Sequence, residues 1–265
     1  MAKVKVCVLR TAGTNCDKET AFAFIKAGAE AELVHVNSLV RQDNSLDDYS
    51  ILALPGGFSY GDDIASGKVF ANELRCKLAD SLRKFVSQGK LIIGICNGFQ
   101  ILVKSGLLPG GVNFTQETSL IINDSGKFED RWVYLKVSGC KSVRVSKCVW
   151  TKGLPEIIYL PVAHGEGKFI AKDKGILERL EKKGQIVFKY CDERGVLAGY
   201  PYNPNGSMKS IAGICDETGR ILGLMPHPER HVLYRQHPRW ARRKDTSTGD
   251  GLKIFENGVK YARKN

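Results

Sequence analysis

The sequence lacks several features that mark specialised classes of protein. No apolar run approaches the ~20 residues that a membrane-spanning helix needs. The first residues show no signal-peptide pattern, and neither an internal repeat nor a low-complexity linker is present. We therefore expect a cytoplasmic protein without a membrane partner, in which residues 1–265 form a single domain.

The cysteines lack the spacing of a disulfide framework. The chain has eight of them, scattered and without a CxxC pair. This pattern favours reduced thiols, and we expect no metal site. Cys7, Cys191 and Cys215 lie in apolar runs and are expected to pack in the core.

Acidic residues are scarce relative to basic ones. Lys and Arg total 40 against 28 Asp and Glu, which gives a net charge of +12. This excess is compatible with an acidic partner, a phosphorylated substrate or nucleic acid, and equally with a merely solvated surface. Only segment 235–248 concentrates basic residues, and we expect it to be an exposed insert. Because no nucleic-acid-binding motif is present, no specific nucleic-acid partner is expected.

The first part of the chain alternates short apolar runs with helical spacing. Repeated strand–helix units with fully apolar strands indicate a parallel sheet covered by helices on both faces. Functional groups of such sheets collect beyond the carboxyl ends of the strands. Strands are predicted at residues 4–9, 31–36, 49–54 and 90–95, and helices from residue 17, over 69–87 and over 97–103.

The rest of the chain has strand patterns separated by turns rather than by helices. This indicates an antiparallel extension of the same sheet. Strands are predicted at 132–137, 143–149, 157–161, 185–190, 210–215 and 221–224, the last two joined by a turn, and a final helix at 251–262.

Cys96 lies between a buried strand and a helix, in the stretch G-I-C-N-G at 94–98. A cysteine flanked by glycines at this junction is the thiol counterpart of a nucleophile elbow. The sulfur would lie at the positive end of a helix, which favours the thiolate. The alternatives are a buried structural thiol at Cys96, or Cys16 as the nucleophile, although Cys16 lacks the elbow.

His227 and Glu229 supply a base and a carboxylate to orient it. Pro226 and Pro228 flank the histidine and predict a stiff, extended segment. Alternate residues of an extended segment point the same way, so both side chains would lie on one side. His231 and His164 are competing bases.

The turn P-G-G at 55–57 offers an oxyanion hole. Glycine lets the backbone approach a tetrahedral oxyanion, which needs preorganised N–H donors. The N–H of Gly57 or Phe58 would pair with that of Asn97, the residue after the proposed nucleophile. The alternative is an ordinary turn.

With these residues in view, the chain resembles the class I glutamine amidotransferases. The matching stretches run in family order over almost the whole chain. They are GTNCD at 13–17, LPGGFSYGD at 54–62, GICNGFQIL at 94–102, PVAHGEG at 161–167, IAGI at 211–214, MPHPER at 225–230 and GDGLKIF at 249–255.

The resemblance implies a flavodoxin-like sheet sandwich that hydrolyses glutamine. Cys96 would form a γ-glutamyl thioester, His227 would carry the proton and Glu229 would hold His227. The ammonia would pass to a separate large synthetase subunit of purine biosynthesis, and a small accessory subunit is a further partner that the resemblance allows. ATP and Mg are expected in that partner and no cofactor in this chain. Glutamine would be bound by Ser59, Tyr60, Gly61, Asp62 and Gln100.

Two other readings of the sequence stay open. One is a different cysteine hydrolase of the same fold, and the other is a non-catalytic binding protein. Segments 139–152 and 235–248 look longer than a compact member of the family requires, and their role is unassigned.

Overall fold

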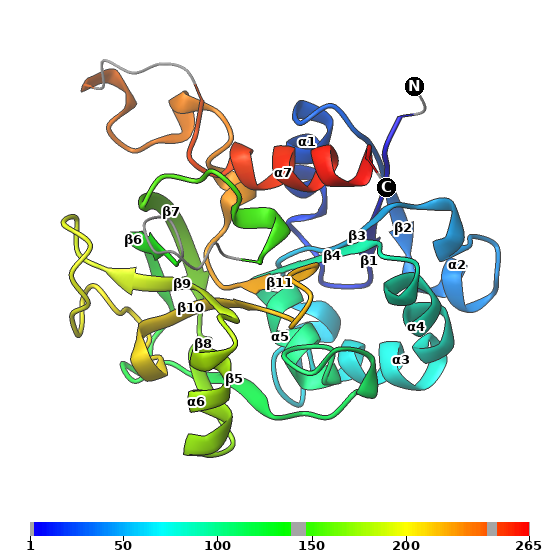
Figure 1. Ribbon diagram of the computed structural model, residues 1–265, viewed down its shortest axis with the longest axis horizontal. Coiled ribbons are helices and arrows are strands. Elements are labelled where there is room, and N and C mark those ends of the chain that lie inside the picture. Colours follow the sequence, from blue (N-terminus) through cyan, green and yellow to red (C-terminus); the bar gives the residue numbers. More distant parts are fainter. Residues whose placement is uncertain (1–2, 139–146, 243–247, 265) are drawn as a thin grey trace.

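A nine-stranded mixed sheet forms the centre of the molecule, with strand order β2-β1-β3-β4-β11-β10-β9-β6-β7 (Figure 1). The computed structural model describes residues 3–138, 147–242 and 248–264. The first five strands of this order, which are β2, β1, β3, β4 and β11, run parallel to one another. The other four strands pair antiparallel with their neighbours. The predicted parallel sheet with an antiparallel extension is therefore confirmed.

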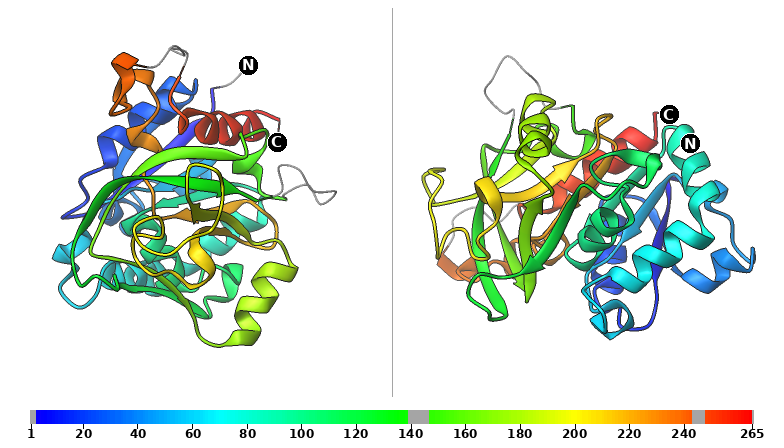
Figure 2. Two further views of the ribbon diagram at one scale, coloured as in Figure 1. Left: turned by 90° about the vertical axis from the view of Figure 1, so that its left-hand side faces the viewer. Right: turned by 90° about the horizontal axis from the view of Figure 1, so that it is seen from below.

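The parallel half consists of apolar strands covered on both faces. Every residue of β3, β4 and β11 is buried. Helices α1 and α7 pack on one face, and α3, α4 and α5 lie on the other (Figures 1 and 2). The strands are β1 (Lys5–Arg10), β2 (Glu30–His35), β3 (Ile51–Leu54), β4 (Leu91–Ile95) and β11 (Ile221–Leu224). The helices are α1 (Asp17–Lys26), α2 (Val36–Val40), α3 (Lys68–Lys77), α4 (Ala79–Ser87), α5 (Asn97–Ser105) and α7 (Leu252–Ala262).

The antiparallel half ends in an edge strand that contains a proline. It comprises β6 (Glu129–Val137), β7 (Ile157–His164), β9 (Ile186–Cys191) and β10 (Ile211–Cys215). The sequence predicts that the strand from Ile157 ends at Pro161, but β7 continues to His164. Proline is tolerated on an edge strand because no further strand needs its missing N–H. The Pro161 carbonyl instead accepts the N–H of His227 at 2.8 Å.

A small second sheet and a helix were not predicted. Strands β5 (Thr118–Ile122) and β8 (Glu166–Ala171) pair antiparallel, and α6 (Lys174–Lys182) follows β8. Phe99 of α5 stacks on Phe169 of β8 with ring centroids 6.4 Å apart, so this sheet is joined to the core below the main sheet (Figure 1). It brings Glu166 toward the helix that follows Cys96.

Two further predictions differ from the structure. The helix predicted over 69–87 is divided at Leu78, whose φ of −122° and ψ of 11° are not helical. Leu78 is itself buried, so the bend keeps the apolar residues of both helices in the core. Of the strand predicted at 143–149, residues 143–146 lie outside the described residues and 147–149 form no strand. Short 3₁₀ helices occupy Leu46–Asp48, Ser59–Asp62, Gly111–Asn113, Val149–Thr151, Met208–Ser210, Pro228–Arg230, Tyr234–Gln236 and Trp240–Arg242.

The described residues include no helix with the length and apolar character required to cross a membrane.

The basic segment is exposed over residues 235–242, except for the half-buried His237, while 243–247 lie outside the described residues. The ring of His237 packs beside Trp132 and Tyr159 at centroid distances of 5.7 and 5.4 Å. The segment is thus attached to the edge of the sheet through this histidine.

Helix α5 approaches strand β3 so closely that only glycine fits at Gly98. A Cβ atom there would lie 1.9 Å from the carbonyl oxygen of Leu54, which is backbone and cannot rotate away. We expect Gly98→Ala to lower the free energy of unfolding by on the order of 3 kcal/mol, because overpacking forces the helix from the sheet. Gly110→Ala is the control, since its nearest neighbour would be a flexible Glu117 oxygen at 3.9 Å. Equal urea midpoints for the two variants would contradict this packing.

Candidate active site

Four adjacent parallel strands bring the predicted reactive side chains to one edge of the sheet. Strands β1, β3, β4 and β11 lead into the segments that carry Cys16, Gly56, Cys96 and His227. A Cβ atom on Gly56 would lie 3.1 Å from Cys16 Sγ, 3.5 Å from Cys96 Cβ and 2.8 Å from His227 Cε1. These three side chains therefore surround Gly56, and its lack of a side chain leaves the space between them open.

Cys96 has the backbone of a strained strand-to-helix turn. Its φ of 52° and ψ of −106° are rarely adopted by a residue with a side chain. The turn is held because Cys96 N–H donates to Leu224 O at 2.8 Å and its carbonyl accepts the N–H groups of Phe99 and Gln100. The predicted elbow is thus present. The flanking glycines serve close approach, and the left-handed backbone angle belongs to Cys96 itself.

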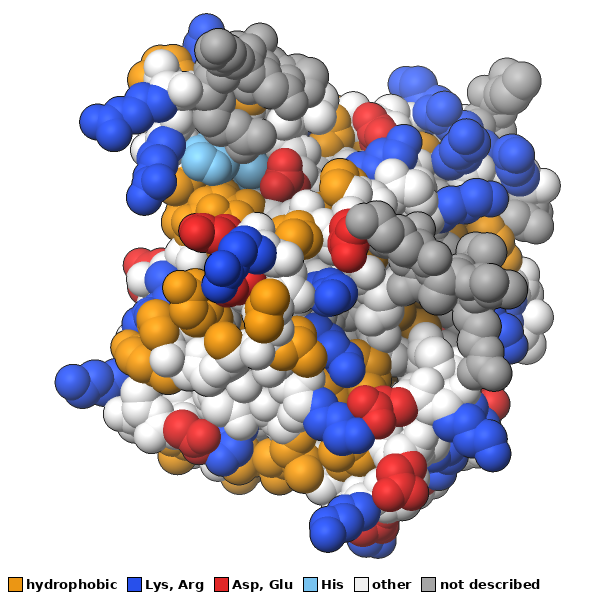
Figure 3. Space-filling view, turned by 60° about the vertical axis from the view of Figure 1, so that its left-hand side comes forward, with side chains coloured by type: hydrophobic (Ala, Val, Ile, Leu, Met, Phe, Trp, Pro, Cys, Tyr) orange, Lys and Arg blue, Asp and Glu red, His pale blue; other side chains and the backbone are white. Residues whose placement is uncertain are grey.

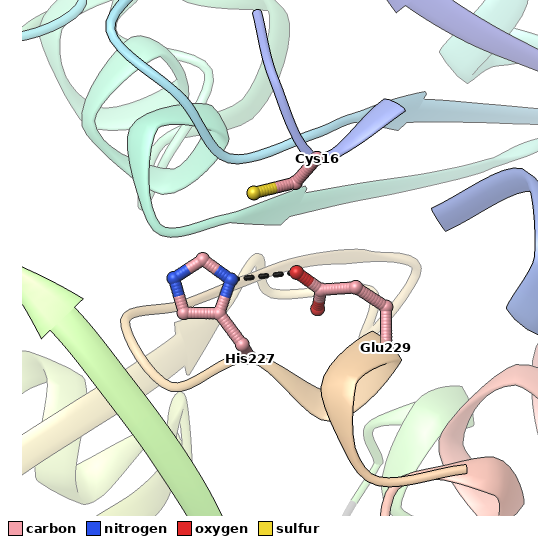
Figure 4. A group of neighbouring side chains, drawn as sticks. All are labelled: Cys16, His227 and Glu229. Carbon is pink, nitrogen blue, oxygen red and sulfur yellow. Dashed lines mark hydrogen bonds and ion pairs between the residues drawn. The ribbon is translucent and has the colours of Figure 1, made fainter. Parts of the chain in front are cut away.

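His227 and Glu229 form a buried pair (Figure 4). The imidazole Nδ1 donates to Glu229 Oε1 at 2.6 Å, and each residue is 1% exposed. The segment is not extended as predicted, because Pro228–Arg230 is a turn of 3₁₀ helix. Proline is well suited to the first position of such a turn, since its missing N–H would have no acceptor there. The turn nevertheless brings the carboxylate back onto the imidazole.

The electrostatic surroundings favour protonated His227. Burial disfavours the imidazolium, but the Glu229 carboxylate and the Cys96 and Cys16 sulfurs outweigh it and raise the pKa of His227 well above its usual value. A histidine that holds its proton beside a thiol can stabilise a thiolate and later donate that proton. This charge arrangement is what a cysteine nucleophile requires.

The two competing histidines are held by other partners. His164 Nδ1 lies 3.1 Å from Asn123 Oδ1, and burial together with nearby His227 lowers the pKa of His164 to about 3. It is therefore neutral near neutral pH and a weak base. His231 Nδ1 lies 2.8 Å from the carbonyl oxygen of Tyr159. His227, in contrast, contacts Cys96 and has a carboxylate partner.

Cys16 lies in the same site, although its sequence context favours it less than Cys96 as the nucleophile. It precedes α1 without an elbow, with φ −102° and ψ 17°. Its Sγ accepts a hydrogen bond from Arg230 Nη2 at 3.0 Å and donates to Asn15 Oδ1 at 3.1 Å. The motif GTNCD after the first strand was the only signal in the sequence for this position. Contact between Cys16 and His227 depends on the parallel strand order and not on any local pattern.

The structure distinguishes between the two predicted oxyanion donors of the 55–58 turn. Phe58 N–H donates to Gly13 O at 2.9 Å and is already engaged. Within the described part of the chain, no backbone acceptor is assigned to the N–H of Gly57 or Asn97. Gly57 has φ 144°, and a Cβ there would lie 2.7 Å from Gly13 O. These contacts favour Gly57 over Phe58 as the partner of Asn97 in the predicted oxyanion hole.

Three of the residues predicted to bind glutamine, Ser59, Asp62 and Gln100, are hydrogen-bonded to Asn97. Asn97 Oδ1 accepts the N–H and hydroxyl of Ser59 at 3.2 and 2.6 Å. Asn97 Nδ2 donates to Gln100 Oε1 at 2.9 Å and Asp62 Oδ1 at 3.3 Å. Tyr60 and Asp62, each with φ 55°, and Gly61, with φ 71°, complete the loop. The side chains of Ser59, Asp62 and Gln100 are therefore linked to the residue that follows Cys96.

A buried lysine extends this network and was missed in the sequence. Lys104 is 6% exposed, and its Nζ donates to Ser66 O at 2.6 Å and Glu166 Oε2 at 3.3 Å. Burial lowers the pKa of Lys104, and Glu166 acts in the opposite direction. Gln100 Nε2 donates to the carbonyl oxygen of Glu166 at 2.6 Å. Nothing in the local pattern of α5 distinguishes this lysine from a solvated one.

The sequence matches the family described as "CobB/CobQ-like glutamine amidotransferase domain" over residues 3–262. It is 51% identical over 264 residues to the "Phosphoribosylformylglycinamidine synthase subunit PurQ" of Dehalococcoides mccartyi, with 99% of each chain covered. It is 45% identical over 274 residues to the subunit of the same name from Methanococcus maripaludis, with 98% of each chain covered.

Solved structures of other proteins are also similar to this chain. A chain in the structure of PurLQS from Thermotoga maritima is similar with a TM-score of 0.73 and 35% identity, covering 98% of this chain and 99% of that one. The glutaminase domain of Trypanosoma brucei CTPS has a TM-score of 0.56 at 14% identity, over 99% of this chain and 95% of that one, which shows a shared fold alone. The chain belongs to the glutamine amidotransferases, in the family of phosphoribosylformylglycinamidine synthase PurQ subunits. The family predicted from the motifs is confirmed.

Neutral, buried His164 should make stability depend on pH. Its pKa falls from 6.5 in the unfolded chain to about 3 in the folded one. Between these values the unfolded state binds one more proton, so the free energy of unfolding falls as pH drops from 6.5 toward 3. His227 is protonated in both states below pH 6.5 and adds no slope there. We expect His164→Asn, which keeps a donor toward Asn123, to remove up to about 1.4 kcal/mol per pH unit from this slope. Equal slopes in urea unfolding at pH 4.5–6 would contradict the assignment.

Proposed function

We propose that this chain hydrolyses glutamine and supplies ammonia to a synthetase that makes formylglycinamidine ribonucleotide in de novo purine biosynthesis. The observation that carries the proposal is the elbow cysteine Cys96 beside the buried His227–Glu229 pair. The family of named PurQ subunits supplies the biochemical context. Support for the alternatives, another cysteine hydrolase or a non-catalytic binding protein, is correspondingly weaker.

Cys96 acts as the nucleophile in this mechanism. Its thiolate attacks the side-chain carboxamide carbon of glutamine and forms a tetrahedral intermediate. His227 gives its proton to the departing nitrogen, which leaves as ammonia, and a γ-glutamyl thioester remains. Water then attacks the thioester and transfers a proton to His227, which releases glutamate and restores the starting state. Glu229 holds the imidazole throughout and stabilises its positive charge.

Gly57 and Asn97 stabilise the oxyanion of both tetrahedral intermediates. Their N–H groups lie on the turn after β3 and on the residue after Cys96, which is the arrangement of a two-donor hole. One such donor is worth about 10²–10³ in rate. Glutamine lies against the loop of Ser59, Tyr60, Gly61 and Asp62, which Gln100 orients through Asn97.

The partner in this proposal is a large synthetase subunit together with a small accessory subunit. The similar structure named PurLQS supports such an assembly. ATP and Mg act in the synthetase, and this chain requires no cofactor of its own. We place the protein in the cytoplasm.

Nucleic acid is not a partner in this proposal. On the face shown in Figure 3, several Lys and Arg side chains gather at the upper right, and the others are scattered among acidic and apolar ones. The sequence contains no nucleic-acid-binding motif to accompany them.

Replacing the proposed nucleophile should separate the two activities of the assembled enzyme. We expect Cys96→Ala to abolish glutamine-dependent synthesis but to leave ammonia-dependent synthesis close to that of the wild type, because the synthetase chemistry lies elsewhere. Cys76→Ala, at an exposed thiol, is the matched control and should retain both. Substantial glutamine-dependent turnover by Cys96→Ala would exclude Cys96 as the nucleophile.

A glutamine-mimicking electrophile should separate Cys96 from its neighbour Cys16. We expect the adduct on the peptide containing Cys96, because only this thiol lies at the elbow. His227→Gln should slow the labelling, since the thiolate loses its imidazolium. Mass spectrometry that locates the first adduct on Cys16 would reverse the two roles.

A further inference from the structure

Cys16 places a second thiol beside the His227–Glu229 pair (Figure 4). Its Sγ, an imidazole nitrogen of His227 and a carboxylate oxygen of Glu229 all lie within 4.8 Å of one another. Each of the three residues is 1% exposed. The proposed hydrolysis uses the histidine and the carboxylate but gives Cys16 no task.

One atom of this cluster has lone pairs that no protein group uses. Glu229 Oε2 is buried and has no hydrogen-bond partner in the parts of the chain that the structure describes. Buried acceptors without partners are costly and mark places where something else can bind. Glu229 thus presents one carboxylate oxygen beyond the one that accepts the hydrogen bond from His227.

We propose that Cys16, His227 and Glu229 form a binding site for Zn²⁺ or a similar thiophilic divalent cation, and that the bound cation blocks the reaction. Thiolate, imidazole and carboxylate are the ligands that zinc prefers. One thiolate and one carboxylate balance the two charges of the cation, so the three ligand side chains and the cation are neutral together. Binding releases the Cys16 thiol proton and the proton held between His227 and Glu229.

Only modest movements are needed to close the site. Zinc–ligand bonds of about 2.0–2.3 Å place tetrahedral ligand atoms about 3.5 Å apart, within the present spread. Arg230, which donates to Cys16 Sγ at 3.0 Å, can keep this bond to a metal-bound thiolate and orient it. The His227–Glu229 hydrogen bond must open, which removes the proton carrier from the reaction.

The consequence for turnover rests on the proposed function, whereas the binding itself does not. The cation would be an inhibitor rather than a cofactor, because it occupies residues that hydrolysis requires. The sequence led us to expect no metal site, since the ligands come from opposite ends of the chain and have no metal-binding spacing.

The test is a titration of the purified chain with Co²⁺ alone, without glutamine. We expect a thiolate-to-cobalt charge-transfer band and the visible bands of tetrahedral cobalt, both abolished by added Zn²⁺. Cys16→Ser should lose the charge-transfer band and bind Zn²⁺ at least tenfold more weakly in competition with a chromophoric chelator. Cys76→Ser is the matched control at an exposed thiol and should match the wild type.

X-ray absorption provides a second measurement, made on the wild-type chain. X-ray absorption of the zinc-loaded wild-type chain should show one sulfur among its ligands, with the others nitrogen or oxygen. A metal ligand set with no sulfur or with two sulfurs would overturn the proposal. A charge-transfer band that survives in Cys16→Ser but disappears in Cys96→Ser would also overturn it. Glutamine turnover by Cys96→Ala would refute the proposed function and leave the cobalt result unaffected.

Discussion

The left-handed backbone at Cys96 is the constraint on which the rest of the site depends. A residue with a side chain adopts φ 52° and ψ −106° only when its surroundings enforce them. Here the neighbouring strand β11 accepts the N–H of Cys96 through Leu224, and the first turn of α5 donates to its carbonyl. The chain that leaves this strand after Leu224 then carries His227. One strand pairing thus fixes both the strained turn and the approach of the base.

Charge balance is the second constraint, because the reactive groups are removed from water. A buried imidazolium is stable only beside negative charge, which Glu229 provides at 2.6 Å. Burial, together with repulsion by the first imidazolium, lowers the pKa of nearby His164 to about 3. Arg230 brings a further positive charge to the edge of the cluster, where it contacts the sulfur of Cys16. The site therefore holds one protonated histidine and not two.

Much of the fold was predictable because apolar runs and turn residues are local signals. The strands ending at Leu54 and Ile95 are buried throughout, and such strands appear in the sequence as continuous apolar segments. Strand β5 and helix α6 were missed, since each has an exposed face and no continuous run. The break at Leu78 was also missed, because helical periodicity continues across it.

The candidate site was predictable where chemistry follows spacing along the chain, and not where it follows contacts across the sheet. Cys96, His227 and Glu229 were recognised because their flanking glycines and prolines constrain the backbone locally. The engagement of Phe58 N–H by Gly13, and the position of Cys16 against His227, depend on how β1 lies beside β3. No residue pattern within either segment indicates that β1 and β3 lie side by side.

Asn97 connects the reactive turn to the loop expected to hold the substrate. Its N–H faces the proposed oxyanion hole, while its side chain binds Ser59, Asp62 and Gln100. Any movement of the loop is thereby transmitted to the residue adjacent to Cys96. Because Lys104 and Glu166 anchor the far side of this network, the small β5–β8 sheet also influences the site. The second sheet, invisible in the sequence, is thus a structural support for the oxyanion donor.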